Sequence, residues 1–165
     1  MFDEEKKERT RLTRLQAKKK AESYCAYQER SQQEMRDKLY SWGLHSLDVE
    51  NVIAELISEN FLSEERFAKA YTSGKFKIKH WGRIKIVNGL KFHRISPRLI
   101  KEALEEIDPD EYFATLERIL EKKSAILREA DPYKRRIKLA QYALSRGFEN
   151  NLIFDILNNN DLEEK

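Results

Sequence analysis

Apolar residues recur along the chain at intervals of three and four, the spacing that places them on one face of an α-helix. Charged residues and strong helix formers occupy most other positions. The pattern predicts an all-α protein with helices over 5–28, 31–42, 47–60, 63–79, 83–93, 97–107, 109–128, 132–146 and 149–158. Only residues 75–79 alternate with period two. Because no partner strand is predicted elsewhere, we interpret them as the end of a helix.

Several residue pairs mark where these helices begin. All three prolines follow a good N-cap residue, in Ser96-Pro97, Asp108-Pro109 and Asp131-Pro132. Proline is tolerated at the first helical position, where its missing N–H has no partner to lose. Ser31 and Glu34 have the spacing of a capping box, in which each side chain accepts from an N–H of the first turn.

An internal repeat emerges when Gly43, Arg94 and Gly147 are superposed, at spacings of 51 and 53 residues. Apolar residues then coincide four and eight positions before each of them, and one, six and ten positions after. This arrangement predicts two helices joined by a tight turn, with a lead helix before them, in each of three units. We expect a charged arm over 1–16 and three-helix repeats over 17–60, 61–108 and 109–160.

Composition supports a folded helical chain and limits its environment. Charged residues make up 37% and hydrophobic residues 40% of the 165 positions. No apolar run approaches the ~20 residues that span a bilayer, and the first residues lack the apolar segment of a signal peptide. We therefore expect a cytoplasmic protein with no membrane contact. Cys25 is the only cysteine, so an internal disulfide is excluded, and we interpret it as a buried, inert thiol.

The sequence offers no cluster of residues suited to catalysis. The five glycines are scattered and form no phosphate-binding loop. The three histidines have no metal-ligand spacing with Cys25 or with a paired acid. We expect no catalytic residues, no metal and no cofactor, and therefore a protein that is not an enzyme.

Positive charge is concentrated in the middle third of the chain. Residues 61–108 carry a net charge of +5, while the flanking thirds each carry −1. Between Arg66 and Lys101 there are eleven Lys or Arg residues and not one Asp or Glu. A like-charged run is self-repulsive, which favours a binding role over simple solvation.

Candidate binding residues follow from this run. Cations neutralise phosphates with little regard to base sequence, and aromatic rings can stack on bases. The candidates are Lys75, Lys77, Lys79, Trp81, Arg83, Lys85, Lys91 and Arg94, with Lys134 and Arg135 as a second, shorter cluster. The alternative is that the aromatics Phe76, Trp81 and Phe92 are core residues and that the lysines only solvate the surface.

Three stretches of the sequence resemble the RecX family, the regulators of the RecA recombinase. They are Arg30-Ser31 to Trp42-Gly43, Leu56 to Ala68 with Asn60-Phe61-Leu62-Ser63-Glu64-Glu65-Arg66-Phe67, and Gly82 to Ile95 continuing to Leu104. Arg83, Gly89 and Arg94 depart from the family's usual proline, acid and glycine. Gly89 should lower helix stability by roughly 0.5–1 kcal/mol relative to alanine.

The resemblance implies three tandem three-helix repeats in an elongated, curved array. It also implies binding in the groove of the RecA–DNA filament, contact with adjacent RecA protomers, and loss of strand exchange and ATP hydrolysis. We expect a monomer that contacts single- or double-stranded DNA mainly without sequence specificity. Two alternatives stay open. One is a sequence-specific helix-turn-helix protein that reads duplex DNA, and the other is a protein–protein adaptor without affinity for nucleic acid.

Overall fold

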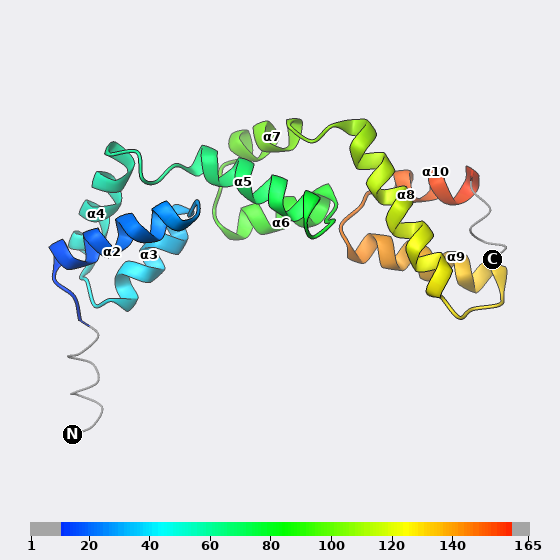
Figure 1. Ribbon diagram of the computed structural model, residues 1–165, viewed down its shortest axis with the longest axis horizontal. Helices are drawn as coiled ribbons and strands as arrows, with labels where there is room; N and C mark the ends of the chain where they lie inside the picture. Colours follow the sequence, from blue (N-terminus) through cyan, green and yellow to red (C-terminus); the bar gives the residue numbers. More distant parts are fainter. Residues whose placement is uncertain (1–10, 160–165) are drawn as a thin grey trace, which may run out of the picture.

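The computed structural model describes residues 11–159, which fold into nine helices and no strand (Figure 1). The helices are α2 (Arg14–Tyr27), α3 (Gln32–Ser41), α4 (Ser46–Ser58), α5 (Glu64–Lys77), α6 (Arg83–Phe92), α7 (Pro97–Glu105), α8 (Pro109–Ile126), α9 (Pro132–Ser145) and α10 (Asn150–Asn159). They form three groups of three in chain order, which we call repeats 1, 2 and 3. The repeats lie in an elongated arch, with repeat 2 in the middle (Figure 1).

The superposed positions turn out to share one backbone conformation. Gly43, Arg94 and Gly147 have φ values of +91°, +58° and +93°, and each ends the second helix of its repeat. The next residue in each repeat donates its N–H to a carbonyl five positions back, at 3.1–3.2 Å. This left-handed C-terminal turn satisfies carbonyls that the helix leaves free. The predicted repeat is confirmed, and Arg94 adopts the turn without being glycine.

Helix caps match the sequence patterns in most places. Ser96 and Asp108 accept hydrogen bonds from the third residue beyond, with proline at the first helical position. Asp131 stands at the same place before α9 but makes no capping hydrogen bond through its side chain. The capping box at residue 31 is half formed. Ser31 accepts from the Glu34 N–H at 3.0 Å, while the Glu34 carboxylate faces His93 instead.

The first helix begins later than predicted. Thr13 caps α2 by accepting from the Gln16 N–H, and Gln16 returns a hydrogen bond to the Thr13 N–H, so this pair forms the full capping box. Residues 11–13 are therefore not helical, contrary to the prediction. Most of the predicted arm over 1–16, and the start of the predicted helix at residue 5, lie outside the described residues. Residues 75–77 complete α5 and 78–79 form the turn that follows it, so 75–79 are the end of a helix, as interpreted, but the helix stops two residues earlier than predicted.

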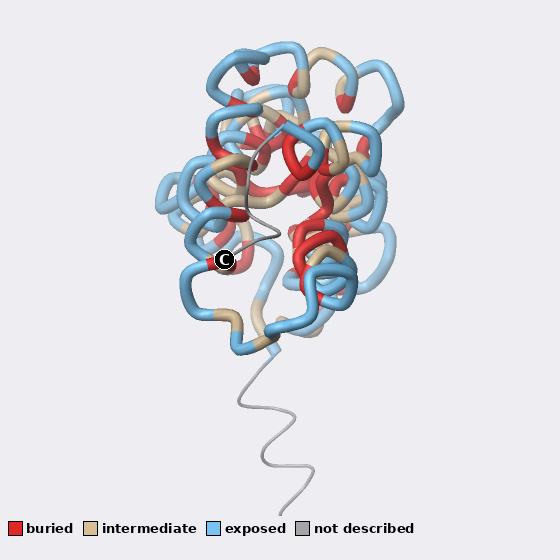
Figure 2. Tube along the Cα trace, turned by 90° about the vertical axis from the view of Figure 1, so that its right-hand side faces the viewer, coloured by how far each residue is buried: buried red, intermediate tan, exposed pale blue. Residues whose placement is uncertain are grey.

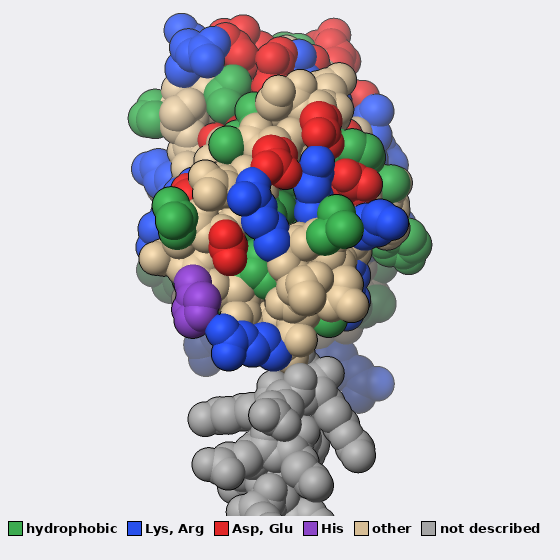
Figure 3. Space-filling model, turned by 90° about the vertical axis from the view of Figure 1, so that its left-hand side faces the viewer, with side chains coloured by type: hydrophobic (Ala, Val, Ile, Leu, Met, Phe, Trp, Pro, Cys, Tyr) green, Lys and Arg blue, Asp and Glu red, His purple; other side chains and the backbone are tan. Residues whose placement is uncertain are grey.

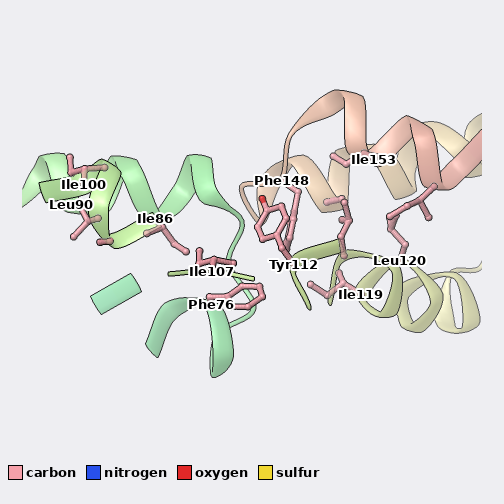
Figure 4. Packing of buried hydrophobic residues seen from close by; sticks show 14 of the residues in the cluster. Phe76, Ile86, Leu90, Ile100, Ile107, Tyr112, Ile119, Leu120, Phe148 and Ile153 are labelled. Atoms are coloured by element: carbon pink, nitrogen blue, oxygen red, sulfur yellow. The ribbon is translucent and has the colours of Figure 1, made fainter. Parts of the chain in front are cut away.

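The buried residues form two separate cores. One lies within repeat 1 and the other runs without interruption through repeats 2 and 3. Buried positions follow the helix faces that turn toward neighbouring helices (Figure 2). Aromatic side chains join repeats 2 and 3, since Tyr112 lies 5.7 Å from Phe76 and 5.2 Å from Phe148 between ring centroids (Figure 4).

Backbone contact reinforces this second joint. The Gly82 N–H donates to the Arg146 carbonyl at 2.8 Å, and the Ile84 N–H donates to the Gly147 carbonyl at 3.0 Å. A Cβ built on Gly82 would lie 2.3 Å from both carbonyl atoms of Gly147. The beginning of α6 therefore approaches the turn after α9 more closely than any side chain would allow.

The joint between repeats 1 and 2 is polar. The Arg66 guanidinium pairs with Glu29 at 2.8 Å, and His93 Nδ1 lies 3.3 Å from the Glu34 carboxylate and 3.2 Å from the Ser31 hydroxyl. Phe67 and Tyr71 pack edge-on against the His93 ring from repeat 2. No buried hydrophobic residue is shared across this joint among the described residues.

Gly89, one departure from the family pattern, has a packing reason. A Cβ there would lie 2.0 Å from the hydroxyl of Tyr71. Because glycine has no Cβ, α5 and α6 can approach each other with the Tyr71 ring between them. None of the described helices is long and apolar enough to cross a membrane.

Two glycine-to-alanine substitutions test the second joint. We expect Gly82→Ala to lower the free energy of unfolding by about 3 kcal/mol, because its Cβ would overlap backbone atoms that cannot move aside independently. Gly74→Ala is the matched control, since a Cβ there meets nothing within 4 Å. In the interior of α5 it should raise the free energy of unfolding by about 0.5–1 kcal/mol. Urea denaturation followed by circular dichroism measures both, and equal effects would contradict the close approach.

Candidate nucleic-acid interface

Two lysines flank the indole of Trp81 at the junction of α5 and α6. The ammonium groups of Lys75 and Lys85 lie 4.7 and 4.5 Å from a Trp81 ring centroid, and Tyr71 stands edge-on at 6.5 Å. Lys75 also lies 5.3 Å from the Tyr71 ring. These cation–π contacts are worth about 0.5–1 kcal/mol each at exposed sites and keep two cations beside one aromatic surface. We call Lys75, Trp81 and Lys85 the Trp81 cluster.

The loop that carries Trp81 is held from both sides. Within repeat 2, the Trp81 N–H donates to the Lys75 carbonyl at 3.0 Å, and His80 takes a left-handed φ of +56°. From repeat 3, the Arg146 guanidinium donates to the Lys79 carbonyl. The second joint therefore positions the Trp81 cluster as well as joining the two repeats.

Arg83 lies at the same junction, but its side chain makes contacts that join repeats 2 and 3. Its guanidinium stacks 3.8 Å from the Tyr112 ring centroid and pairs with Glu149 at 2.8 Å. Tyr112 accepts from the Arg83 N–H at 3.0 Å and donates its own proton to Glu149. Burial raises the pKa of Tyr112 far above its usual value, and the Glu149 hydrogen bond raises it further. The phenol therefore stays protonated and acts as a donor. Arg83, which was predicted at a binding surface, is instead paired within the protein.

Ion pairs divide the eleven cations of the acid-free run into two classes. Four of them pair with carboxylates that lie outside the run: Arg66 with Glu29, Lys69 with Glu65 and Glu106, Arg83 with Glu149, and Arg98 with Glu102. The other seven form no ion pair with any residue between 11 and 159: Lys75, Lys77, Lys79, Lys85, Lys91, Arg94 and Lys101. Repeat 2 thus presents uncompensated positive charge, whereas acidic and basic groups are interspersed on the end formed by repeat 1 (Figure 3).

The predicted residues do not all meet at one place. Lys77 and Lys79 are exposed beside the Trp81 cluster, at the end of α5. Lys91 and Arg94 are exposed at the opposite end of α6, whose ten residues span about 15 Å. Lys134 is exposed on α9 in repeat 3. The basic surface therefore extends along α6 from the Trp81 cluster.

Arg135 lies inside the protein, contrary to its predicted place at a binding surface. Its side chain is 1% exposed. The guanidinium donates to the Ser124 hydroxyl at 2.8 Å, to the Ser124 carbonyl, and to the Leu127 carbonyl at 3.0 Å. It closes the turn between α8 and α9 by satisfying carbonyls at the end of α8. We therefore exclude it from the candidate interface.

The aromatic residues of the basic segment have different roles. Phe76 is 3% exposed and belongs to the core, as the alternative interpretation held. Trp81 is partly buried against the core. Phe92 is 82% exposed, and sequence reasoning did not select it. Phe92 lies two positions after Leu90 and six after Ile86 on α6, so it points away from the core that those two residues enter. This spacing could have identified Phe92 as an exposed aromatic residue.

Nothing in the described part of the chain resembles a metal centre. No group of three or more His, Cys, Asp or Glu side chains within residues 11–159 could hold a metal ion. Cys25 is buried, and burial raises the pKa of its thiol to about 11. The thiol is therefore protonated at neutral pH, which agrees with its interpretation as inert.

Known proteins match this arrangement over most of its length. The first, second and third three-helix domains of RecX match residues 17–56, 63–104 and 110–157, respectively. Regulatory protein RecX of Pelodictyon phaeoclathratiforme is 33% identical over 119 residues, which cover 72% of each chain. The chain belongs to the RecX family.

Other RecX proteins agree in sequence and in fold. Regulatory protein RecX of Clostridium perfringens is 30% identical over 140 residues, covering 81% of this chain. The chain spans 65% of that relative's length. The crystal structure of RecX from Lactobacillus salivarius superposes with a TM-score of 0.77 at 23% identity, covering 90% of this chain and 97% of the other. At this identity the likeness establishes the shared fold of tandem three-helix repeats.

Neighbouring cations on α9 test the division between structural and surface charge. We expect Arg135→Gln to lower the free energy of unfolding by about 2–3 kcal/mol, because it leaves buried carbonyls unsatisfied. Lys134→Gln, the adjacent exposed control, should change it by less than about 0.5 kcal/mol. Thermal and urea denaturation measure both. A stable Arg135→Gln variant would show that these hydrogen bonds do not stabilise the turn between α8 and α9.

Proposed function

We propose that this RecX protein binds the RecA–DNA nucleoprotein filament and modulates it, mostly by inhibiting the recombinase and its ATPase, and so regulates DNA repair and recombination. The observation that carries the proposal is the basic surface of repeat 2, where seven cations form no ion pair with residues 11–159 and two of them flank Trp81. Membership of a family of regulatory proteins supports it.

The chemistry of this surface suits DNA held without base readout. Lysines attract phosphates as mobile point charges, and each neutralised phosphate releases counterions. The exposed ring of Phe92 offers a face on which an unpaired base can stack, while Trp81 holds two of the lysines in place. We therefore expect affinity for single- or double-stranded DNA, mainly non-specific and strongly dependent on salt.

The shape of the molecule suits a repeating partner. An elongated arch presents a long contact surface, and a filament offers equivalent sites along its length. In this proposal a monomer lies along the filament, repeat 2 faces DNA, and repeats 1 and 3 contact neighbouring RecA protomers. Such a wedge would oppose the filament movements that strand exchange and ATP turnover require.

A charge-neutralised variant tests the role of the Trp81 cluster. We expect Lys75→Gln/Lys85→Gln to weaken binding to fluorescein-labelled oligo(dT) about tenfold. The salt dependence should also change, with the slope of log K against log salt smaller by about 1.4, the value for two phosphate contacts. Lys19→Gln/Lys122→Gln, which removes the same charge from exposed sites on α2 and α8, should leave both unchanged. Equal losses of affinity in the two variants would mean that the Trp81 cluster contributes only through the overall charge of the protein.

The filament itself provides the test of function. Saturating protein should slow ATP turnover by RecA on poly(dT), and the Lys75→Gln/Lys85→Gln variant should require a higher concentration for the same effect. Unchanged turnover at saturation would refute the proposal. Competition between one defined duplex and random DNA addresses the helix-turn-helix alternative, because a strong preference for one sequence would favour it.

A further inference from the structure

A groove that no residue of the Trp81 cluster lines has a different chemistry. It lies along α7, between α6 and the start of α8, and has a volume of about 610 Å³. Its floor is aliphatic, formed by Pro97, Ile100, Leu104, Ile107 and Pro109. Ile100 and Ile107 are almost buried, whereas both prolines are exposed. The volume falls within the ~300–1,000 Å³ typical of ligand sites.

Three of the four charged side chains that line the groove are positive. Lys91 of α6 and Lys101 of α7 line it, and neither pairs with a carboxylate of the described residues. Arg83 lies at the end nearest α8 but is already paired with Glu149. Glu105 is the one carboxylate in the lining. The rim therefore offers two cations for an incoming anion, above a floor that only apolar groups can fill.

This combination favours a protein segment over nucleic acid. A nucleic acid would bring phosphates and flat bases, and no aromatic side chain lines the groove to stack on them. A helix or extended peptide that buries leucine-sized side chains and carries carboxylates beside them would satisfy both the floor and the rim. A basic segment would meet like charges.

We propose that the groove between α6 and α7 binds an acidic segment of a protein partner, anchored by aliphatic side chains and flanked by carboxylates that pair with Lys91 and Lys101. This proposal rests on the proposed function in one respect only, which is that the partner is the protein part of the filament. Repeat 2 then has two surfaces: the Trp81 cluster for phosphates and the α6–α7 groove for protein. Lys91, predicted among the nucleic-acid contacts, moves to the protein side.

Peptides test the groove on the full chain without any filament. One probe is a peptide of about 12 residues that alternates leucines with glutamates, and its matched control carries glutamine at every glutamate. With the methyl groups labelled for NMR, the acidic peptide should shift Ile100 and Leu104 and bind at least tenfold more tightly than the control. Equal binding, or shifts centred on Ile84 of the outer face of α6, would overturn the proposal.

Two variants separate the surfaces. Lys91→Gln/Lys101→Gln should weaken the acidic peptide about tenfold, equal to ~1.4 kcal/mol, and oligo(dT) by less than about threefold. Lys75→Gln/Lys85→Gln should weaken oligo(dT) binding more than peptide binding. Oligo(dT) that shifts Ile100 and Leu104 more than the peptide does would assign the groove to nucleic acid. Self-association that Lys91→Gln/Lys101→Gln abolishes, seen by sedimentation, would assign it to a second copy. Both results contradict the proposal.

The groove and the proposed function can fail separately. If the chain slows RecA turnover but binds neither peptide, the groove proposal is wrong and the filament function stands. If the acidic peptide binds at the groove while RecA turnover is unaffected, the groove keeps its ligand class and the filament function is refuted.

Discussion

Gly82 and Gly147 meet backbone to backbone, at a distance that leaves no room for a Cβ between them. Because Gly82 immediately precedes α6 and Gly147 lies in the turn that ends α9, this contact fixes how repeat 3 stands against repeat 2. The hydrogen bonds of Gly82 and Ile84, the Arg83–Glu149 pair and the stacking of Tyr112 all depend on the same approach. Trp81 lies one residue away, so the position of its flanking lysines depends on it as well.

The two joints differ in the forces that hold them. Between repeats 2 and 3, a continuous apolar core adds hydrophobic burial to the backbone contact, which resists relative movement. Between repeats 1 and 2, ion pairs and a histidine contact carry the connection, and surface ion pairs are individually weak. Repeats 2 and 3 thus behave as one body that carries the basic surface, while repeat 1 is joined to it more weakly.

Arg94 occupies a backbone conformation that glycine usually adopts. The turn after the second helix places glycine in the left-handed region in repeats 1 and 3, and a side chain there costs about 1–2 kcal/mol. Repeat 2 accepts that strain at an exposed position, where Arg94 adds to the basic surface a cation that pairs with no carboxylate of residues 11–159. The same left-handed turn therefore forms in repeat 2 without glycine.

Local patterns explain what sequence analysis could predict. Helix faces, proline starts and the turn at residues 43, 94 and 147 depend on neighbours within a few positions, and most of them were found. The partners of Arg83, Arg66 and Arg135 were not, because Glu149, Glu29 and the Ser124 carbonyl lie 66, 37 and 11 residues away in sequence. A cation that closes a joint and one that faces solvent look alike until the fold brings these acceptors together. The groove along α7 was missed for the same reason, since it exists only between three packed helices.

Hydrogen–deuterium exchange of the chain, with and without RecA assembled on poly(dT), tests the central claim most directly. The claim is that repeat 2 is the surface that meets the filament. Binding should slow exchange in peptides covering 75–91 and 97–104 more than in exposed segments of repeats 1 and 3. Protection confined to repeat 1 or repeat 3, with repeat 2 exchanging as in the free chain, would contradict it.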